Sequence, residues 1–484
     1  MSASPAPSGP GEVIRESLRI AGEKVARDRT IEVRHPYNGA VVATVPKATI
    51  EDVRRALGIA RAYRSKLTRH DRYKILMQAG AIIATQRDTL ARLITLESGL
   101  CLKDSLYEVG RASDVLLFAA NRALVDDGEV FSCDLTAHGK SRKVYTLREP
   151  LLGAITAITP FNHPLNQVIH KVAPAVATNN RMIVKPSEKT PLTAFALADI
   201  LYQAGLPPEM LSVVTGDPAE IADELLTNAD VDLVTFTGGV PIGKYIAGKA
   251  VYKRQVLELG GNDPIIVLED ADLEEAATLA VGGSYKNSGQ RCTAVKRMLV
   301  QESVADRFVE LLVEKTRAVK YGDPFDPAMD MGTVIDEASA IYFEQVVNEA
   351  VAAGARLLIG NIRCGALYSP TVLDRVTPDM TVVRHETFGP VSPVIRFKTV
   401  DDAIRISNGT VYGLSSSICT NRLDLITRFI QELNVGSVNV REVPGYRLEM
   451  TPFGGIKDSG LGYKEGVIEA MKSFCNTKTY SLPW

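Results

Sequence analysis

Short apolar runs that alternate with helical patterns dominate the middle of the chain and constrain its fold most. Between about residues 150 and 260, the predicted strands are 154–159, 182–185, 211–215, 233–236 and 256–259. Helical patterns occupy 165–178 and 191–204, and shorter ones follow Pro218 and Pro241. Strands and helices in strict alternation predict a parallel, doubly wound sheet that helices cover on both faces.

A second alternation of the same kind runs from about residue 262 to residue 440. Its predicted strands are 264–268, 298–301, 371–373, 394–397, 416–419 and 437–440, and its predicted helices are 273–286, 304–315, 337–353, 400–407 and 423–433. The chain has 484 residues, and a single hydrophobic core stops growing at ~250–300. We therefore predict an α/β protein with two doubly wound domains and an active site in the cleft between them.

Composition excludes several classes of partner. Basic and acidic residues nearly cancel, 55 against 57, so we expect neither nucleic acid nor a membrane surface as a partner. No apolar run approaches the ~18 residues that cross a bilayer, and residues 1–12, rich in Pro, Ser and Gly, predict a loose tail and no signal peptide. Six scattered cysteines without a C-x-x-C pair indicate free thiols in the cytoplasm and no metal site.

Residues 128–147 have the polar, β-branched and aromatic texture of a protruding hairpin, with a turn at 137–140. The last residues, 474–482, also have the pattern of a strand. Because a lone hairpin is marginally stable in water, we expect it to pair with another subunit of a homodimer or homotetramer.

Three residues stand where chemistry is expected. Cys292 follows Gly289 and adjoins Arg291, whose charge would lower the thiol pKa from ~8.5; the alternative is a buried structural thiol. Glu258 ends an apolar strand just before two glycines, where desolvation would raise its pKa and suit a general base; the alternative is a salt-bridged glutamate. Asn162 follows the first strand and is either an oxyanion donor or a turn residue.

Two further segments have the chemistry of nucleotide binding. Lys185 and Glu188 close the second strand, where they would bind ribose hydroxyls or form a solvated edge. Residues 238–244 match G-x-x-x-x-G-K, but Tyr245 stands where a P-loop needs Ser or Thr. We therefore reject a nucleoside triphosphatase.

Seven short signatures together resemble the aldehyde dehydrogenase superfamily over nearly the whole chain. They are PFNHP at 160–164, KPSE at 185–188, FTGG at 236–239, LELGGNDP at 257–264, GQRC at 289–292, ETFGP at 386–390 and PFGGIKDSG at 452–460. The resemblance implies a dinucleotide-binding domain of residues 1–127 and 149–258, a catalytic domain of residues 259–445, and oligomerisation or bridging segments at 128–148 and 463–484.

The resemblance also implies roles for individual residues. Cys292 would be the nucleophile, Glu258 the general base, and Asn162 the oxyanion donor together with the Cys292 backbone N–H. The implied cofactor-binding residues are Thr159, Lys185, Ser187, Glu188, Gly238, Gly239, Gly243, Leu259, Gly260, Glu386 and Phe388. Glu188 would repel the 2′-phosphate of NADP, so we expect NAD.

The sequence departs from the superfamily pattern at two places. Phe161 replaces the usual tryptophan before the asparagine, which would reshape the substrate pocket. Gly239 replaces the usual serine, which removes a hydroxyl contact to the pyrophosphate; backbone N–H groups at the helix start near Pro241 would still bind phosphate.

Four basic residues bear on the substrate, namely Arg111, His163, Arg291 and Arg447. Taken singly, Arg111 would form an i,i+3 surface pair with Glu108, and His163 would be a packed loop histidine. Their arrangement is similar to that of the non-phosphorylating glyceraldehyde-3-phosphate dehydrogenases, whose substrate is anionic. Among superfamily members that oxidise anionic aldehydes, the chain most closely resembles the phosphonoacetaldehyde dehydrogenases. Glyceraldehyde 3-phosphate, lactaldehyde and succinate semialdehyde remain alternative substrates.

Two other functions are compatible with the superfamily. A catalytically inactive binding protein would have lost the nucleophile or the base, whereas Cys292, Glu258 and Asn162 are all present. A coenzyme-A-acylating enzyme would generally lack the glutamate base. The sequence therefore predicts hydrolysis of the enzyme-bound thioester to a carboxylic acid.

Overall fold

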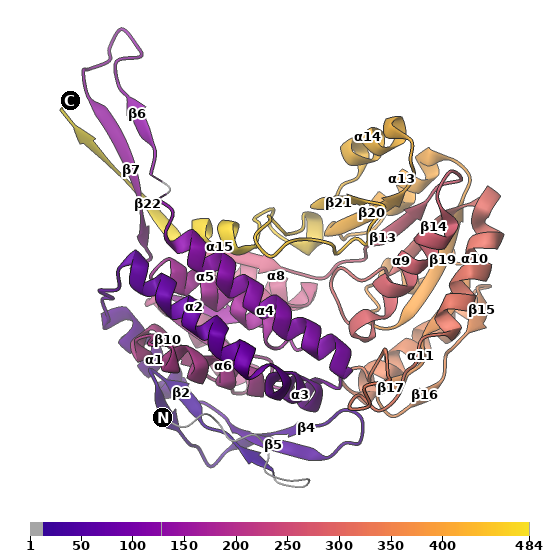
Figure 1. The fold of residues 1–484 in the computed structure, drawn as a ribbon, viewed down its shortest axis with the longest axis horizontal. Helices are drawn as coiled ribbons and strands as arrows, with labels where there is room; N and C mark the ends of the chain where they lie inside the picture. The colour runs from indigo at the N-terminus through magenta and orange to yellow at the C-terminus, as the bar shows by residue number, and fades with distance from the viewer. Residues whose placement is uncertain (1–12, 127, 484) are drawn as a thin grey trace.

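The computed structural model describes residues 13–126 and 128–483 and contains two seven-stranded sheets (Figure 1). The first has the order β12-β11-β8-β9-β10-β2-β3. Its strands are β2 (Leu18–Ile20), β3 (Glu23–Val25), β8 (Ala154–Ile158), β9 (Met182–Lys185), β10 (Leu211–Val213), β11 (Val231–Thr237) and β12 (Arg254–Glu258). The five strands from β12 to β10 are parallel, as predicted, and β2 and β3 extend the sheet as an antiparallel edge.

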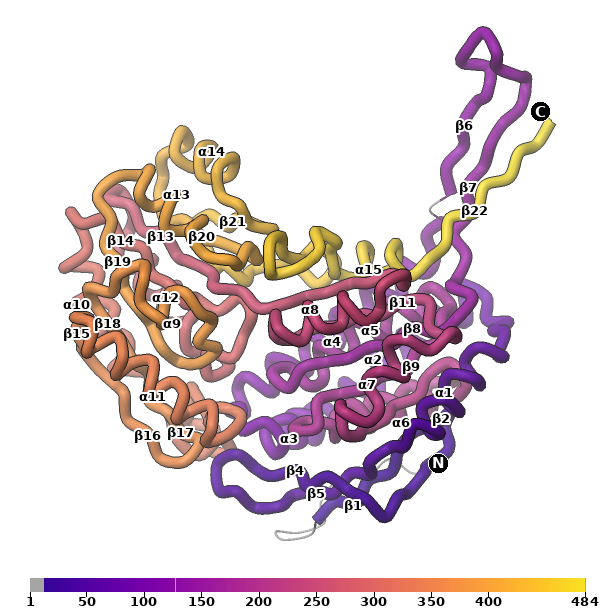
Figure 2. Tube along the Cα trace, turned by 180° about the vertical axis from the view of Figure 1, so that it is seen from behind, coloured from indigo at the N-terminus to yellow at the C-terminus, as the bar shows by residue number. Residues whose placement is uncertain are grey.

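Helices cover both faces of this sheet (Figures 1 and 2). They are α1 (Ile50–Ala62), α2 (Arg69–Thr85), α3 (Arg87–Ser98), α4 (Leu102–Ala123), α5 (Asn166–Ala177), α6 (Leu192–Gln203), α7 (Pro218–Thr227) and α8 (Val240–Lys249). Met182 and Val184 of β9 pack with α2 to α6, whereas Ile183 packs with α1, α7 and α8. Alternate side chains of one strand thus enter two separate cores, which explains its continuous apolar run.

The second sheet has the order β15-β18-β19-β14-β13-β20-β21. Its strands are β13 (Pro264–Val267), β14 (Arg297–Gln301), β15 (Arg356–Ile359), β18 (Thr371–Asp374), β19 (Val391–Phe397), β20 (Ser415–Cys419) and β21 (Ser437–Val440), covered by α9 (Leu273–Tyr285), α10 (Glu302–Arg317), α11 (Glu337–Ala352), α13 (Val400–Asn408) and α14 (Leu423–Glu432). All neighbours are parallel except β15 and β18. The prediction of two doubly wound α/β units is confirmed.

Several small elements complete the chain. They are β1 (Ile14–Arg15), β4 (Thr30–Arg34), β5 (Val41–Pro46), β16 (Arg363–Cys364), β17 (Leu367–Tyr368), α12 (Thr381–Arg384) and α15 (Val467–Ser473). No helix among the described residues has the length and apolarity that a bilayer crossing needs. Residues 1–12, predicted as a loose tail, lie outside the described part, and the predicted domain boundaries stay predictions.

A three-stranded sheet projects from the body of the molecule (Figures 1 and 2). It consists of β6 (Val130–Ser132), β7 (Lys143–Pro150) and β22 (Cys475–Leu482) in the order β22-β7-β6. β22 pairs with β7 along its whole length, from Cys475 opposite Pro150 to Leu482 opposite Lys143. The hairpin is therefore not alone, because the chain's own last strand supports it. Its pairing with another subunit stays a prediction.

Candidate active site

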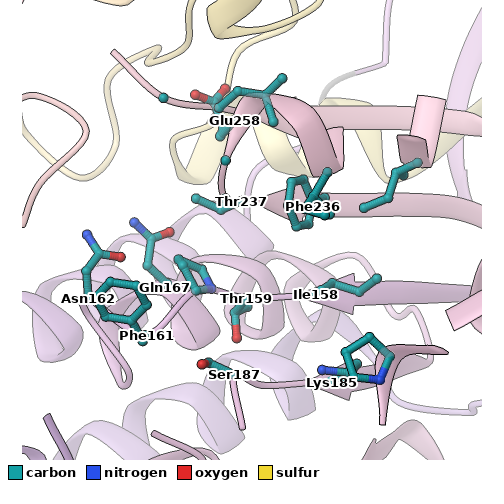
Figure 3. Close-up of a pocket in the computed structure, with 18 of the residues that line it drawn as sticks. Ile158, Thr159, Phe161, Asn162, Gln167, Lys185, Ser187, Phe236, Thr237 and Glu258 are labelled. Carbon is teal, nitrogen blue, oxygen red and sulfur yellow. The ribbon is translucent and has the colours of Figure 1, made fainter. Parts of the chain in front are cut away.

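A cavity of about 630 Å³ lies at the carboxyl ends of β8, β9, β11 and β12 (Figure 3). Asn162, Glu258 and Cys292 all line it, so the structure brings together the three predicted catalytic residues. Of the predicted cofactor residues, the cavity is lined by Thr159, Lys185, Ser187, Glu188, Gly238, Gly239, Leu259, Gly260, Glu386 and Phe388. Gly243 is not among the lining residues: a β carbon there would lie 2.4 Å from the Leu259 Cδ2, so it is needed for packing.

The loop before Cys292 has an unusual backbone. Asn287, Ser288 and Gly289 are all left-handed, with φ angles of 61°, 53° and 71°. The Asn287 backbone N–H donates to Asp104 of α4 at 2.7 Å, which holds the turn in place. At Gly289, a β carbon would meet the Gly389 carbonyl oxygen at 2.4 Å. The left-handed backbone and the lack of room for a β carbon explain why residue 289 is glycine. The strained turn brings Cys292 to the cavity.

Reciprocal amide bonds connect Asn162 to this loop. The Asn162 Nδ2 donates to the Gln290 carbonyl at 2.9 Å, and the Asn287 Nδ2 donates to the Asn162 carbonyl at 2.9 Å. A side-chain amide has two N–H donors, so one remains for a substrate oxygen. Asn162 is buried and doubly anchored, which goes beyond the alternative of a simple turn residue.

The charge state of Cys292 differs from the sequence prediction. Burial raises the pKa of its thiol to about 11, against the opposing charges of Lys296 and Arg447. The expectation that Arg291 produces a net lowering is therefore wrong, because desolvation outweighs the neighbouring cations. The Arg291 Nη2 instead donates to the Gly283 carbonyl at 2.6 Å.

Glu258 has the environment of a general base. It is buried, and neither carboxylate oxygen has a hydrogen-bond partner in the described part of the chain. Burial and then the charge of Glu465 raise its pKa well above the ordinary value, opposed by Arg447, Lys171 and Lys464. The shift has the predicted direction, and the salt-bridged alternative is wrong for this residue.

The rest of the cavity fits a dinucleotide. The Thr159 and Thr237 hydroxyls are buried without a partner among the described residues. α8 begins after Gly239 without a side-chain cap, so its first N–H groups face the Gly238–Gly239 side of the cavity. A β carbon at Gly260 would lie 2.1 Å from the Glu386 Oε2. Only glycine therefore allows the backbone to approach Glu386 this closely.

Lys185, Glu188 and Glu386, three of the predicted cofactor-binding residues, already have polar partners within the chain. Lys185 forms an ion pair with Glu188, so these two residues are not a solvated edge. Glu386 lies 3.0 Å from the Lys296 ammonium and accepts a hydrogen bond from the Gly261 N–H at 3.1 Å. The Phe388 ring contacts Phe161 edge-on, with centroids 5.9 Å apart.

The four predicted substrate residues are not among the residues that line this cavity. Arg291 and Arg447 both interact electrostatically with Cys292, and Arg111 interacts with both guanidinium groups. The Arg447 Nη1 and the Arg291 Nε are buried without a hydrogen-bond partner among the described residues. Arg291 and Arg447 thus lie near Cys292 and Arg111 lies near both of them, and the Arg447 guanidinium group also stacks on Phe453 at 3.7 Å.

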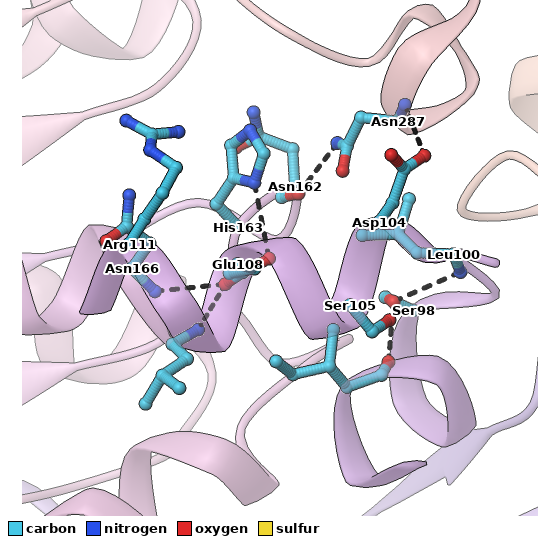
Figure 4. Close-up of polar contacts among 12 residues, drawn as sticks. Ser98, Leu100, Asp104, Ser105, Glu108, Arg111, Asn162, His163, Asn166 and Asn287 are labelled. Atoms are coloured by element: carbon cyan, nitrogen blue, oxygen red, sulfur yellow. Dashed lines mark hydrogen bonds and ion pairs between the residues drawn. The ribbon is translucent and has the colours of Figure 1, made fainter. Parts of the chain in front are cut away.

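α4 holds the loop that follows Asn162 through Glu108 (Figure 4). Glu108 accepts hydrogen bonds from the Leu165 and Asn166 backbone N–H groups, each at 2.9 Å, and lies 3.2 Å from the His163 Nδ1. It is buried, so the predicted surface pair between Glu108 and Arg111 is wrong. Arg111 pairs instead with Glu449, far along the chain.

Sequence reasoning missed several functional neighbours. Lys296 faces Cys292 and Glu386, and Gln167 lines the cavity. Lys286 lies over the Tyr107 ring at 3.1 Å, and burial with the charges of Arg291 and Arg111 lowers its pKa to about 8. The i,i+4 spacing of Asp104 and Glu108 on an amphipathic helix could have indicated that both side chains face the same part of the protein. The other contacts join segments that are distant in the sequence, so no local pattern indicates them.

Comparison with known proteins agrees with this geometry. The model of the aldehyde dehydrogenase family matches residues 24–480. The chain belongs to this family. As an aldehyde dehydrogenase, it is an NAD(P)-dependent oxidoreductase that converts aldehydes to acids.

Named relatives within the family differ in substrate and cofactor. The 3-sulfolactaldehyde dehydrogenase of Priestia aryabhattai is 37% identical over 456 residues, which cover 94% of this chain and 95% of the relative. The NADP-dependent glyceraldehyde-3-phosphate dehydrogenase of Bacillus halodurans, solved with NADP, has a TM-score of 0.93 and 36% identity, and the match covers 97% and 99% of the two chains. An NAD-dependent aldehyde dehydrogenase of Sinorhizobium meliloti has a TM-score of 0.92 and 33% identity, with 97% and 94% covered.

Proposed function

We propose that this aldehyde dehydrogenase oxidises a small aldehyde with an anionic head group, with phosphonoacetaldehyde as the candidate substrate and NAD as the cofactor. The observation that carries the proposal is the cluster of Arg111, Arg291 and Arg447, of which Arg291 and Arg447 interact with Cys292 and have buried nitrogens unpartnered in the described chain. Phosphonoacetaldehyde would be converted to phosphonoacetate.

Electrostatics supports an anion at this place. Glu449 and Asp104 offset part of the charge of these three buried guanidinium groups, which repel one another, and a bound anion would offset more of it. Each guanidinium offers a planar fork to two oxygens, which suits a phosphonate, phosphate, sulfonate or carboxylate. The relatives named for 3-sulfolactaldehyde and glyceraldehyde 3-phosphate act on aldehydes of this charge class.

The first chemical step follows from the positions of Cys292 and Asn162. The Cys292 thiol first loses its proton to water, because its raised pKa keeps it protonated at neutral pH. The thiolate sulfur then forms a bond to the carbonyl carbon, and the carbonyl π electrons move to the oxygen, which becomes an alkoxide. The free N–H of the Asn162 amide and the Cys292 backbone N–H would stabilise this alkoxide. When bound, the nicotinamide ring supplies the hydride acceptor that turns the adduct into a thioester.

Hydrolysis of the thioester is assigned to Glu258. Its carboxylate lines the same cavity as Cys292, and its raised pKa makes it a stronger base than an exposed glutamate. It would take a proton from water while the water oxygen attacks the thioester carbon. The Cys292 sulfur then leaves, and the carboxylic acid is released.

Substrate charge is tested by replacing Arg111 with methionine. Arg111 is preferable to Arg447, which also acts on the charges of Cys292 and Glu258. Loss of one charge-assisted contact costs about 1.5–3 kcal/mol, so we expect KM for phosphonoacetaldehyde to rise about 10- to 100-fold and far more than KM for propanal. The measurement is a kcat/KM panel with phosphonoacetaldehyde, glyceraldehyde 3-phosphate, succinate semialdehyde, lactaldehyde and propanal.

Arg441→Met is the matched control, because Arg441 pairs with Glu275 on the surface. Equal effects of Arg111→Met on anionic and neutral aldehydes would remove the anionic-substrate proposal. A preference of the wild type for another member of the panel would replace phosphonoacetaldehyde by that substrate.

Cofactor choice is tested at Glu188, which lines the cavity at the end of β9. Glu188→Gln removes the carboxylate that would repel a 2′-phosphate while keeping a hydrogen-bonding side chain. We expect kcat/KM for NADP to rise about tenfold relative to NAD, which corresponds to about 1.4 kcal/mol. Initial rates with each cofactor measure this ratio, and an unchanged ratio contradicts the assignment of Glu188.

A further inference from the structure

Glu449 occupies the centre of a buried polar cluster behind the predicted substrate site. One of its carboxylate oxygens accepts a hydrogen bond from the Arg111 Nε, and the other lies 2.5 Å from the His170 Nε2. Arg111 belongs to α4 and His170 to α5, whereas Glu449 belongs to the loop that also carries Arg447. The cluster therefore joins α4 and α5 to the loop that carries Arg447.

The way in which Glu449 holds Arg111 leaves the guanidinium fork free. Among the described residues, the contact through Nε is the hydrogen bond that the structure gives for the Arg111 side chain. The terminal nitrogens remain available, and the side chain is 21% exposed. Arg111 rises from α4 on the same side as His163 (Figure 4), so the fork is available to an anion rather than consumed by its internal partner.

His170 anchors the carboxylate from the opposite side. It is buried on α5, and its Nδ1 has no partner in the described chain. Although burial acts in the other direction, the hydrogen bonds from His170 and Arg111 and the charge of Arg111 lower the pKa of Glu449 below its ordinary value. The carboxylate is thus ionised at neutral pH and offsets the Arg111 charge when no substrate is present.

We propose that Glu449, braced by His170, is a positioning residue that fixes the Arg111 guanidinium for the anionic head group of the substrate and thereby sets specificity for anionic aldehydes. This inference rests on the proposed function. It predicts that the position of the carboxylate matters more than its charge, because a carboxylate by itself repels an anion.

The test compares two substitutions that separate position from charge. Glu449→Asp keeps the charge but withdraws the carboxylate by about one bond length of ~1.5 Å, so Arg111 must move to keep its bond. Glu449→Gln keeps an acceptor oxygen in place without the charge. The readout is the ratio of kcat/KM for phosphonoacetaldehyde to kcat/KM for propanal. We expect Glu449→Asp to lower this ratio at least tenfold and Glu449→Gln to lower it less than threefold.

A double mutant identifies the route of the effect. In the Arg111→Met background, Glu449→Asp is expected to change the ratio less than twofold, because residues that act through one another are not additive. His170→Phe removes the second anchor and supplies an independent variant if Glu449→Asp does not fold; we expect it to lower the ratio at least threefold. Glu442→Asp, in the same loop, is the matched control.

The outcomes separate the two proposals. If Arg111→Met lowers the ratio while Glu449→Asp and His170→Phe leave it unchanged, the positioning role is wrong and the anionic substrate stands. The positioning role is also wrong if Glu449→Gln lowers the ratio as much as Glu449→Asp, or if the effects of Glu449→Asp and Arg111→Met are additive. If Arg111→Met itself leaves the ratio unchanged, the proposed function fails first.

Discussion

Replacement of Cys292 by alanine is expected to abolish NADH formation from every aldehyde, by a factor of at least about 10⁴. No other cysteine lines the cavity in the described chain, and Cys101, Cys419 and Cys475 are buried elsewhere. Alanine keeps the backbone N–H but removes the only sulfur that can form the covalent adduct. Steady-state absorbance of NADH measures the loss.

The control for this variant is Cys364→Ala, because Cys364 is an exposed free thiol that does not line the cavity. It should retain wild-type activity. Cofactor binding to Cys292→Ala, followed by fluorescence titration, shows whether the cavity itself is intact. Turnover by Cys292→Ala above about one thousandth of the wild-type rate would refute covalent catalysis by this residue.

Replacement of Glu258 by glutamine is expected to stop the reaction after the thioester has formed and before it is hydrolysed. Cys292 and Asn162 remain, so the thioester should form with a burst of about one NADH per subunit. Loss of a general base typically costs ~10²–10⁴, and we expect the steady-state rate to fall by that factor. Stopped-flow absorbance resolves the burst from the slow phase, and absence of a burst with intact cofactor binding would contradict the assignment.

The pH dependence of hydrolysis tests the same residue. A base acts in its deprotonated form, so the rate of hydrolysis should fall as pH drops through the pKa of Glu258. Burial and Glu465 raise this pKa, and the fall should therefore begin well above pH 4.5. The Glu258→Gln variant should lose this limb of the profile, which single-turnover hydrolysis at several pH values measures.

Those parts of the fold that are encoded locally were predictable. Strands such as β9 are buried on both faces and therefore read as continuous apolar runs. The edge strands β3 and β15, and β2 beside β3, are short and carry charged residues, so no periodicity marks them. β22 was predicted as a strand, but its partner β7 lies more than 300 residues away, and sequence does not indicate such pairings.

In the site, too, features set by short sequence motifs were predictable, whereas features set by contacts between distant segments were not. The motifs place Asn162, Glu258 and Cys292 at the ends of strands or in loops that line one cavity. The charge environment was not predictable, because it depends on burial and on partners from other segments. Arg291 adjoins Cys292 in sequence, yet Lys296 and Arg447 oppose the burial of the thiol more strongly. Arg111 likewise has its partner at Glu449 and not at Glu108.

Helix α4 gives the two reacting parts a common support. Through Asp104 it holds the turn before the nucleophile, and through Glu108 it holds the loop of the oxyanion asparagine. Asp104 and Glu108 lie about one turn apart on the same helix, so α4 couples the positions of the loop before Cys292 and the loop after Asn162.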